Sequence, residues 1–552
     1  MKKIIALFLA MMLSVSMLSG CGSEENEQGT QQQTQQNTEA STEGNLVSTD
    51  CKGQVLTWNL GIDSSTLDPA HTVSADSKSV VNNTFEGLMR TNGDEVQPAM
   101  AADMPQETVN EDGTVTLTYT LRESSWSDGQ PVKAQDFEFA WKRCADPQTK
   151  AENAYQLSAL LNYDQIAQGT KEADELGVKA LDDKTLEVTL KQPAEYFNKM
   201  LGEPAFMPLR EDLVSGDEAW SKNPQKAVSN GPFALAGYTE GKEFVLAKNK
   251  NYWNQEQVAL DYIVARMLDE NFAPVGMAFG DVVLTQGEIA QPENQTDTEG
   301  NTVEVPKLAD TISAEQTPSG RVVNLVVNAN TGNKLLQNKD VRNALSAALD
   351  RTAAAQAAGG EALLSVSGMG GEMLSASADA EQAKSVIESA ADEENKIEIV
   401  YLENEQTAAA LEAVKSAWEA LGLTVTLTPQ DAQTFQMSRN SLQYADVLCS
   451  VWEADVADRE LYLQPYLSSN TQSGCGYTNP EFDKAMMEAI QAKSEERNEK
   501  FAQAEQILLD DAYVMPLYRE VLTTTSDTAK VSGWSVSPDG TYWFGNATLS
   551  EK

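Results

Sequence analysis

The stretch IEIVYLENEQTAAALEAVKSAWEALGLTVTL, residues 397–427, contains the pattern that decides the fold class. Its two ends, 397–401 and 423–427, are short and rich in β-branched and apolar side chains, as strands are. Between them runs a stripe with the period of a helix: Leu411, Val414, Trp418 and Leu421. Gly422 is placed to end that helix. A strand, a helix and a strand in this order predict a parallel, right-handed crossover, and therefore an α/β fold.

Towards the N-terminus the pattern changes to strands with short helices. Residues 115–121 follow an Asp-Gly turn and alternate apolar with polar side chains, which is typical of a strand with one wet face. Phe137, Ala140 and Trp141 then share one face of a short amphipathic helix. The alternation returns at residues 185–190. The first half of the chain is therefore expected to be rich in strands.

The first 20 residues have the composition of an export signal. Lys2 and Lys3 precede an unbroken apolar run over residues 4–13, which is too short for a comfortable membrane span. Small residues follow the run, as they do before a cleavage site. We therefore expect residues 1–20 to be a secretory signal peptide that is removed on export.

Residues 18–21, with the sequence LSGC, resemble the lipobox of bacterial lipoproteins. The resemblance implies cleavage before Cys21 and diacylation of its thiol, and two acyl chains suffice for stable anchoring in a membrane. An ordinary signal peptide that happens to contain a cysteine is the alternative. Residues 22–47 contain no aromatic side chain. We expect residues 21–52 to form a disordered, lipid-anchored tether.

The charge and the histidine count exclude several functions. The chain has 40 basic and 83 acidic residues and a net charge of −43, whereas phosphate binding needs dense lysine and arginine, so nucleic acid is not an expected partner. His71 is the only histidine, which counts against a Ser-His-Asp or Cys-His hydrolase and against a histidine-rich metal site. The 41% hydrophobic content predicts that the remaining chain of about 500 residues is globular.

The cysteines do not have the spacing of a metal site. Besides Cys21 they are Cys51, Cys144, Cys449 and Cys475, and none of the close pairs that bind zinc is present. Export permits a disulfide, and Cys449 with Cys475 is the first pair to test. The sequence also lacks a glycine-rich phosphate loop and a metalloprotease helix motif. We therefore expect neither a metal nor a cofactor.

A series of short motifs extends over nearly all of the chain after the tether. In chain order they include Leu67-Asp68-Pro69, Phe85-Glu86-Gly87-Leu88, Trp126-Ser127-Asp128-Gly129, Trp141-Lys142-Arg143, Ser229-Asn230-Gly231-Pro232-Phe233, Tyr252-Trp253, Val341-Arg342-Asn343-Ala344-Leu345 and Trp452-Glu453-Ala454-Asp455. Each motif is weak alone, but the ordered set resembles the oligopeptide-binding lipoproteins of peptide ABC importers, which are extracellular solute-binding proteins of the family 5 type.

The resemblance implies a two-lobed clamshell like that of periplasmic binding proteins of class II, with α/β lobes. Lobe I is expected to be discontinuous and to comprise residues 53–97, 205–268 and 515–552. A subdomain at residues 98–204 is inserted in lobe I, and lobe II comprises residues 269–514. The chain then crosses between the lobes more than once, and such crossings can act as a hinge.

The resemblance also implies a function without chemistry. The protein is expected not to be an enzyme but to capture short peptides in a cleft between the lobes and deliver them to an ABC importer permease. It would act as a monomer at the extracellular face of the cytoplasmic membrane, and a Gram-positive-type envelope is favoured. The alternatives are a binding protein of the same fold for a glycan or a metal chelate, and an exported hydrolase that uses paired carboxylates.

The resemblance also implies which residues bind the ligand. For a ligand that adds as an extended strand, Val73-Ser74-Ala75 would offer main-chain partners from lobe I and Val451-Trp452-Glu453 those from lobe II. Asp455 matches the acidic residue of the family that pairs with the α-ammonium of the ligand. Such a pair is favourable because a buried opposite charge avoids the cost of desolvating the ammonium alone. For an isolated aspartate, a surface or capping role is the alternative.

Two further positions carry weaker assignments. Tyr155 would line a side-chain pocket or is a core tyrosine, and Arg439 would meet a peptide carboxylate or is a solvated charge at a helix end. Three positions depart from the family, where some members have a pocket tryptophan, a basic residue and a histidine: Ala432, Cys449 and Thr407. Fewer cations around the cleft are expected to loosen the preference for one ligand length or to shift it away from carboxylate-terminated peptides.

Overall fold

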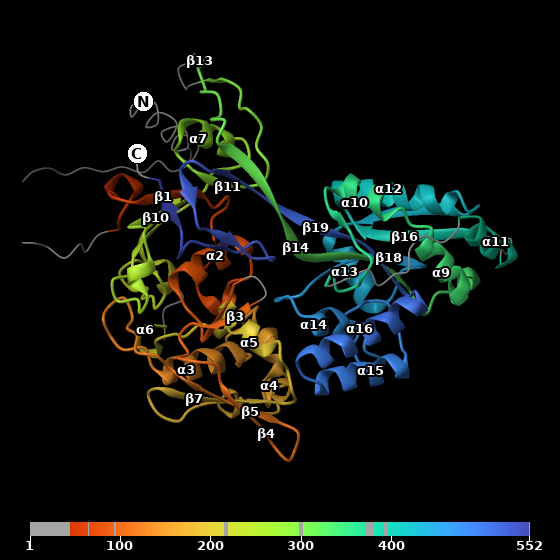
Figure 1. The fold of residues 1–552 in the computed structure, drawn as a ribbon, viewed down its shortest axis with the longest axis horizontal. Helices are drawn as coiled ribbons and strands as arrows, with labels where there is room; N and C mark the ends of the chain where they lie inside the picture. Colours follow the sequence, from red (N-terminus) through yellow and green to blue (C-terminus); the bar gives the residue numbers. More distant parts are fainter. Residues whose placement is uncertain are drawn as a thin grey trace, which may run out of the picture.

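Two bodies lie side by side, and two long strands, β14 (Ile312–Val327) and β19 (Val514–Asp527), run from one body into the other (Figure 1). This computed structural model describes residues 45–64, 66–92, 95–214, 219–296, 302–369, 380–390 and 395–550. The predicted signal peptide and Cys21 lie outside the described residues. Within the described residues, no helix combines the length and the apolar character that a membrane crossing requires.

A single mixed sheet of eleven described strands continues through both bodies. Its order is β17-β16-β18-β14-β19-β11-β1-β10-β9-β8, and β15 pairs with β19 beside this path. The strands of the first body are β1 (Val55–Asn59), β8 (Phe233–Thr239), β9 (Glu243–Lys248), β10 (Tyr262–Arg266) and β11 (Leu284–Gln286). Those of the second body are β15 (Glu361–Ala362), β16 (Lys396–Leu402), β17 (Thr424–Gln430) and β18 (Val447–Glu453).

The first body carries a second, antiparallel sheet of four described strands. The strands are β4 (Gln106–Val109), β5 (Val115–Thr120), β7 (Thr185–Leu190) and β6 (Val178–Ala180), in that spatial order. The alternation in β5 buries Val115, Leu117 and Tyr119, as predicted. The expected amphipathic helix is α3 (Ala134–Ala145), which buries Phe137 and Trp141 completely.

Small elements complete the first body. They are the helices α2 (Ala75–Thr84), α4 (Tyr163–Ala167), α5 (Phe197–Met200), α6 (Glu211–Val214) and α7 (Ala273–Phe279), and the strand pairs β2 (Met89–Asn92) with β3 (Glu95–Pro98), β12 (Gln295–Thr296) with β13 (Thr302–Val303), β20 (Val531–Ser532) with β23 (Thr548–Leu549), and β21 (Ser535–Val536) with β22 (Tyr542–Trp543). Helix α2 begins at Ala75, one of the predicted binding residues.

The second body contains the crossover that the sequence predicted. Strands β16 and β17 pair in parallel and are joined by α12 (Glu405–Glu419), whose apolar stripe is buried. The indole of Trp418 is fully buried, and its Nε1 donates to the carbonyl of Leu345, 3.1 Å away. Gly422 has a φ of +94°, which suits glycine, and it follows the end of the helix as expected.

Helices cover both faces of the sheet in the second body (Figure 1). On one side they are α9 (Lys339–Ala347), α10 (Arg351–Ala358), α11 (Ala380–Ala390) and α12, and on the other α13 (Ala432–Ser441), α15 (Pro480–Gln491) and α16 (Ser494–Asp511). Cys449 packs with the first set and Cys475 with the second. The candidate pair Cys449 and Cys475 does not form a disulfide, because the two thiols are free and belong to separate cores.

The two long strands are where the bodies are joined. Strand β14 pairs with β19 both up to Pro318, beside β11 and β1, and again from Val322, and from Arg321 onward it also pairs with β18. The register between β14 and β19 shifts between Pro318 and Val322. A β-bulge of this kind bends and twists a strand pair. The point where β14 gains β18 as a second partner therefore coincides with the irregular register.

The predicted domain limits remain predictions, but two observations bear on them. Residues 45–52 are ordered against the sheet edge, since Asn45 exchanges two hydrogen bonds with the main chain of Tyr238, at 2.7 and 2.8 Å. The last eight residues of the expected disordered tether, 21–52, are thus packed on the sheet, and residues 21–44 lie outside the described residues. Residues 284–286 pair with β1, on the first-body side of the sheet.

Candidate functional site

The end of β18 has a strand on one side only. Strand β14 pairs with β18 as far as Glu453, but β16 pairs with it only as far as Cys449. Within the described residues, no strand pairs with the other edge of β18 at Val451–Glu453. An extended segment can add to such an edge through main-chain hydrogen bonds, which do not depend on side-chain identity.

Asp455 follows directly after this free edge and contacts the other body. Its Oδ1 accepts hydrogen bonds from the hydroxyl of Tyr155, 2.8 Å away, and from Nε2 of Gln156, 2.7 Å away. Both donors lie on a 3₁₀ helix at Ala154–Ala159 in the predicted inserted subdomain. Burial, followed by the charge of Asp455, raises the pKa of Tyr155. The tyrosine therefore stays a neutral donor at physiological pH.

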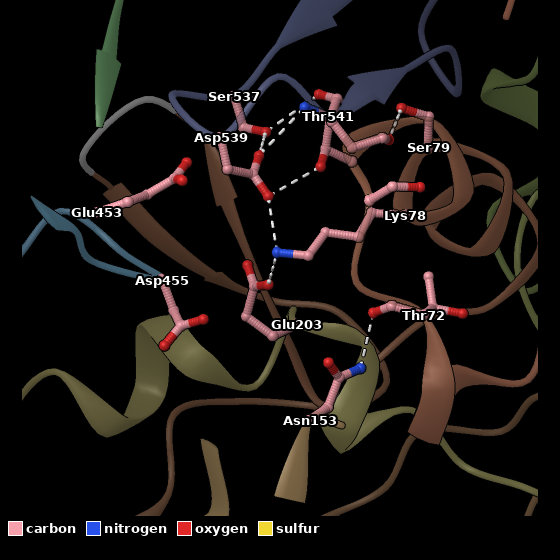
Figure 2. A network of polar contacts seen from close by, with 12 residues as sticks. Thr72, Lys78, Ser79, Asn153, Glu203, Glu453, Asp455, Ser537, Asp539 and Thr541 are labelled. Atoms are coloured by element: carbon pink, nitrogen blue, oxygen red, sulfur yellow. Dashed lines mark hydrogen bonds and ion pairs between the residues drawn. The ribbon is translucent and has the colours of Figure 1, made fainter. Parts of the chain in front are cut away.

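A buried lysine lies close to Asp455 (Figure 2). Lys78 projects from α2, and its Nζ lies 3.0 Å from Oδ2 of Asp539 and 3.3 Å from Oε2 of Glu203. Burial alone lowers the pKa of Lys78, but the two carboxylates outweigh burial and raise it overall. Lys78 is therefore charged and held between two acids that are distant in the sequence.

The two acids respond to burial in opposite ways. Burial raises the pKa of Glu203 to about 7, although Lys78 opposes the shift. Burial also acts on Asp539, but the charge of Lys78 and the hydrogen bonds from Ser537 and Thr541 lower its pKa overall. With Asp455 beside them, three carboxylates surround one lysine, so the cluster suits an added cation.

The predicted main-chain partners of the first body lie at the start of α2. Ser74 caps this helix: its carbonyl accepts from the Lys78 amide at 2.9 Å, and the carbonyl of Ala75 accepts from Ser79 Oγ at 2.6 Å. Val73 is 56% exposed, and no hydrogen bond within the described chain uses its main-chain groups. Of the three residues, Val73 is thus the one whose amide and carbonyl are both available.

Trp452, on the edge of β18, lies near Arg439 of the same body. The indole Nε1 of Trp452 donates to the carbonyl of Leu461 at 3.1 Å, and the guanidinium of Arg439 lies 5.8 Å from the indole ring. Nη2 of Arg439 already donates to the carbonyl of Gln472 at 2.6 Å, and burial lowers the pKa of this arginine. The guanidinium is therefore committed in part to its own body.

Glu453 points towards the joining strands. Its Oε2 lies 3.8 Å from Nη1 of Arg321, and Nε of Arg321 lies 2.8 Å from Oε2 of Glu520. Burial raises the pKa of Glu453, with Arg321 opposing the shift. Arg321 lies within the register shift of β14, where the two bodies are joined. Its ion pair with Glu453 therefore links the edge of β18 to this joint.

The structure reveals four polar residues that the sequence reasoning did not identify. They are Lys78, Gln156, Glu203 and Asp539. Gln156 is adjacent to the predicted Tyr155 and Lys78 lies four residues after Ser74, so proximity in sequence could have drawn attention to both. Glu203 and Asp539 are separated by more than 300 residues, and no local pattern indicates that they meet.

The departures from the family pattern have clear positions. Cys449 is buried in the core of the second body, and Ala432 is exposed at the first residue of α13. Thr407 lies on α12 near Tyr518, where burial raises the pKa of the tyrosine and the hydroxyl of Thr407 opposes the shift. None of the three side chains carries a positive charge.

Two α/β bodies joined by long strands, with a strand edge and an acidic cluster where they meet, define the class of two-lobed substrate-binding proteins. The sequence matches the family described as "Bacterial extracellular solute-binding proteins, family 5 Middle" over residues 95–474, and the protein belongs to this family. Proteins of this family bind solutes outside the cytoplasm.

Individual relatives agree with this assignment. The chain is 29% identical over 526 residues to the oligopeptide-binding protein OppA of Bacillus subtilis, covering 90% of this chain and 93% of the relative. It superposes on the Haemophilus influenzae OppA complex with the peptide RPPGFSPFR with a TM-score of 0.64 at 25% identity, covering 90% and 99% of the two chains. An unliganded, open murein tripeptide-binding protein, MppA, gives a TM-score of 0.72 at 24% identity, covering 90% and 98%.

Proposed function

We propose that the protein captures short peptides between its two lobes and delivers them to an ABC importer. The observation that carries the proposal is the free edge of β18 ending at Asp455, a carboxylate already oriented by donors from the other lobe. The named relatives that bind oligopeptides support the same conclusion.

This arrangement fits a ligand defined by features that every peptide shares. Strand addition at Val451–Glu453 would use the peptide main chain, and Asp455 would pair with the α-ammonium. Val73 would offer main-chain groups from the first lobe, Tyr155 would line a side-chain pocket, and Arg439 would face a peptide carboxylate. Because the ligand contacts both lobes only when they are closed, its binding energy favours the closed form.

The proposal includes no chemical step and no cofactor. We infer that the protein binds and releases its ligand unchanged, as a monomer, and is not an enzyme. Diacylation of Cys21 would hold it at the extracellular face of the cytoplasmic membrane, beside its permease, in a Gram-positive-type envelope. Cys21→Ala is then expected to move the protein from the membrane fraction to the medium or soluble fraction; continued sedimentation with membranes would argue against the anchor.

Ligand-induced thermal stabilisation tests peptide capture directly. Tri-, tetra- and penta-alanine are added at increasing concentration, and a binder is stabilised by RT ln(1 + [L]/Kd). We expect at least one of the three peptides to raise Tm and to be recovered uncleaved by mass spectrometry. N-acetylated versions of the same peptides serve as matched ligands and should stabilise much less. Absence of any shift, or cleavage of the peptide, would contradict the proposal.

A further inference from the structure

The carboxylate of Asp455 uses its two oxygens unequally. Both hydrogen bonds from the other lobe, from Tyr155 and Gln156, end on Oδ1. Within the described residues, Oδ2 has no hydrogen-bond donor. The carboxylate is thus fixed in orientation by one oxygen while the other is left for a ligand.

The amide of Gln156 is used at one end only. Its Nε2 donates to Asp455, whereas its Oε1 is buried and has no hydrogen-bond partner. The residue is only 4% exposed, so a donor reaches Oε1 only when the groups that cover it move, as they do when the two lobes separate. Turning the amide over would bring Oε1 against the Asp455 carboxylate, which is repulsive, so the acceptor end keeps its direction. A buried acceptor without a donor calls for a partner that arrives later.

The surrounding groups supply no such partner. The ammonium of Lys78 bonds Glu203 and Asp539, and the hydroxyl proton of Tyr155 is given to Asp455. The donor that Gln156 lacks must therefore come from outside the described chain. Because Nε2 and Oε1 of Gln156 are bonded to the same carbon atom, a donor that reaches Oε1 would also lie close to the Asp455 carboxylate, which Nε2 already contacts.

We propose that Gln156 is a specificity-determining residue, whose Oε1 accepts a second hydrogen bond from the N-terminal ammonium that binds Oδ2 of Asp455. This inference rests on the proposed peptide-binding function. A primary ammonium has three protons and can serve both acceptors at once. An acetylated terminus loses the charge, and a dimethylated terminus keeps the charge but has a single proton. The pair therefore reads the number of N–H groups as well as the charge.

The test combines variants of Gln156 with modified termini of one peptide. Isothermal titration calorimetry measures the affinity of the best-binding alanine peptide with a primary, an N,N-dimethylated and an N-acetylated terminus. The variants are Gln156→Leu and the nearly isosteric Gln156→Met, which is used if the first does not fold. Gln165→Leu, an exposed glutamine on α4, is the matched control.

We expect Gln156→Leu to weaken binding of the primary amine about tenfold, as loss of one hydrogen bond to a charged donor does. The dimethylated peptide should lose less than about threefold, because its one proton is already given to Asp455. The control variant should match the wild type with all three peptides.

Two results would overturn the inference. If Gln156→Leu leaves the primary amine unaffected, the amide does not contact the ligand. If it weakens the primary and the dimethylated peptides equally, Gln156 only orients Asp455, because both ligands are cations. Wild-type binding that is sensitive to acetylation would leave peptide capture intact in either case, whereas absence of wild-type binding to all the peptides would remove the proposed function as well.

Discussion

The two ends of the segment Val451–Asp455 differ in what holds them. At the Asp455 end, hydrogen bonds come from the opposite lobe, through Tyr155 and Gln156, and a buried charged cluster lies beside them. At the Val451 end, Trp452 and Arg439 make their polar contacts within their own lobe. One end is thus built from both lobes, and the other from one.

This difference indicates how a binding protein can be strict about one feature of its ligand and tolerant of the rest. Contacts from both lobes exist together only in the closed form, so a ligand group placed there affects closure directly. Contacts within one lobe do not change on closure and contribute mainly to fit. We therefore expect the positive end of a peptide to be recognised strictly and its other end loosely.

The largest effect is expected from Lys78→Met, which removes the cation of the cluster. Glu203 and Asp539 would then be two buried carboxylates without a counter-ion, and breaking such a network costs about 3–5 kcal/mol of stability. Urea unfolding measures the loss. The exposed Lys179 on β6 provides the control Lys179→Met, and a loss no greater than that of the control would show that the cluster is not structurally important.

The next largest effect concerns binding. Asp455→Ala should weaken peptide binding by about 3 kcal/mol, or more than about 100-fold, because the ligand ammonium would be buried without its partner. Calorimetry with free and N-acetylated tetra-alanine measures this loss. Asp174→Ala changes an aspartate that is 94% exposed and should have no effect. Equal wild-type affinities for the two peptides would remove Asp455 from the site.

The sequence predicted those parts of the molecule that depend on local pattern. The crossover of β16, α12 and β17 was predictable because periodicity and a glycine at the helix end lie within about 30 residues. Asp455 was proposed as a binding residue through an ordered family motif, since an aspartate alone carries no such signal. Its placement against Tyr155 and Gln156, from the other lobe, is a fact of the structure only.

Contacts between segments that are distant in the chain could not be predicted from the sequence. Glu203 and Asp539 meet at Lys78 through the packing of three separate segments, and charge patterns along the chain do not encode such packing. Whether Cys449 and Cys475 form a disulfide could not be decided from the sequence for the same reason. Cys449 and Cys475 are close in sequence, but the sheet that contains β18 separates the two cores to which they belong.

The cluster beside Asp455 should also make the stability of the folded protein depend on pH. Burial raises the pKa of Glu203 from 4.5 to about 7, so the folded protein holds a proton that the unfolded chain releases above about pH 4.5. The resulting stability is present below pH 4.5 and is lost as the pH rises through about 7. Glu203→Gln should therefore gain about 1–3 kcal/mol relative to the wild type between pH 5 and 8.

Urea unfolding at pH 5, 6, 7 and 8 measures this difference. The exposed Glu172 provides the control Glu172→Gln, for which the difference from the wild type should not change with pH. A stability difference for Glu203→Gln that is the same at all four pH values would contradict the assigned proton.

The smallest effect is expected at the other end, from Arg439→Gln. Nη2 of Arg439 already donates to the carbonyl of Gln472, and its guanidinium lies 5.8 Å from the ring of Trp452, so its own lobe fixes the direction of the side chain. We expect the variant to weaken tetra-alanine binding no more than about threefold, as for a partly screened ion pair. The C-terminal amide of the same peptide should bind the wild type nearly as well as the free acid.

Calorimetry with the acid and the amide checks this expectation in both proteins. A 100-fold preference of the wild type for the free acid that disappears in Arg439→Gln would contradict it, because the peptide would then be fixed by charge at both ends. A ligand fixed at both ends has one permitted length, set by the distance between its two anchors. A ligand fixed only at Asp455 can extend along the β18 edge to different lengths, so this small effect is what distinguishes a binder of one peptide length from a binder of many.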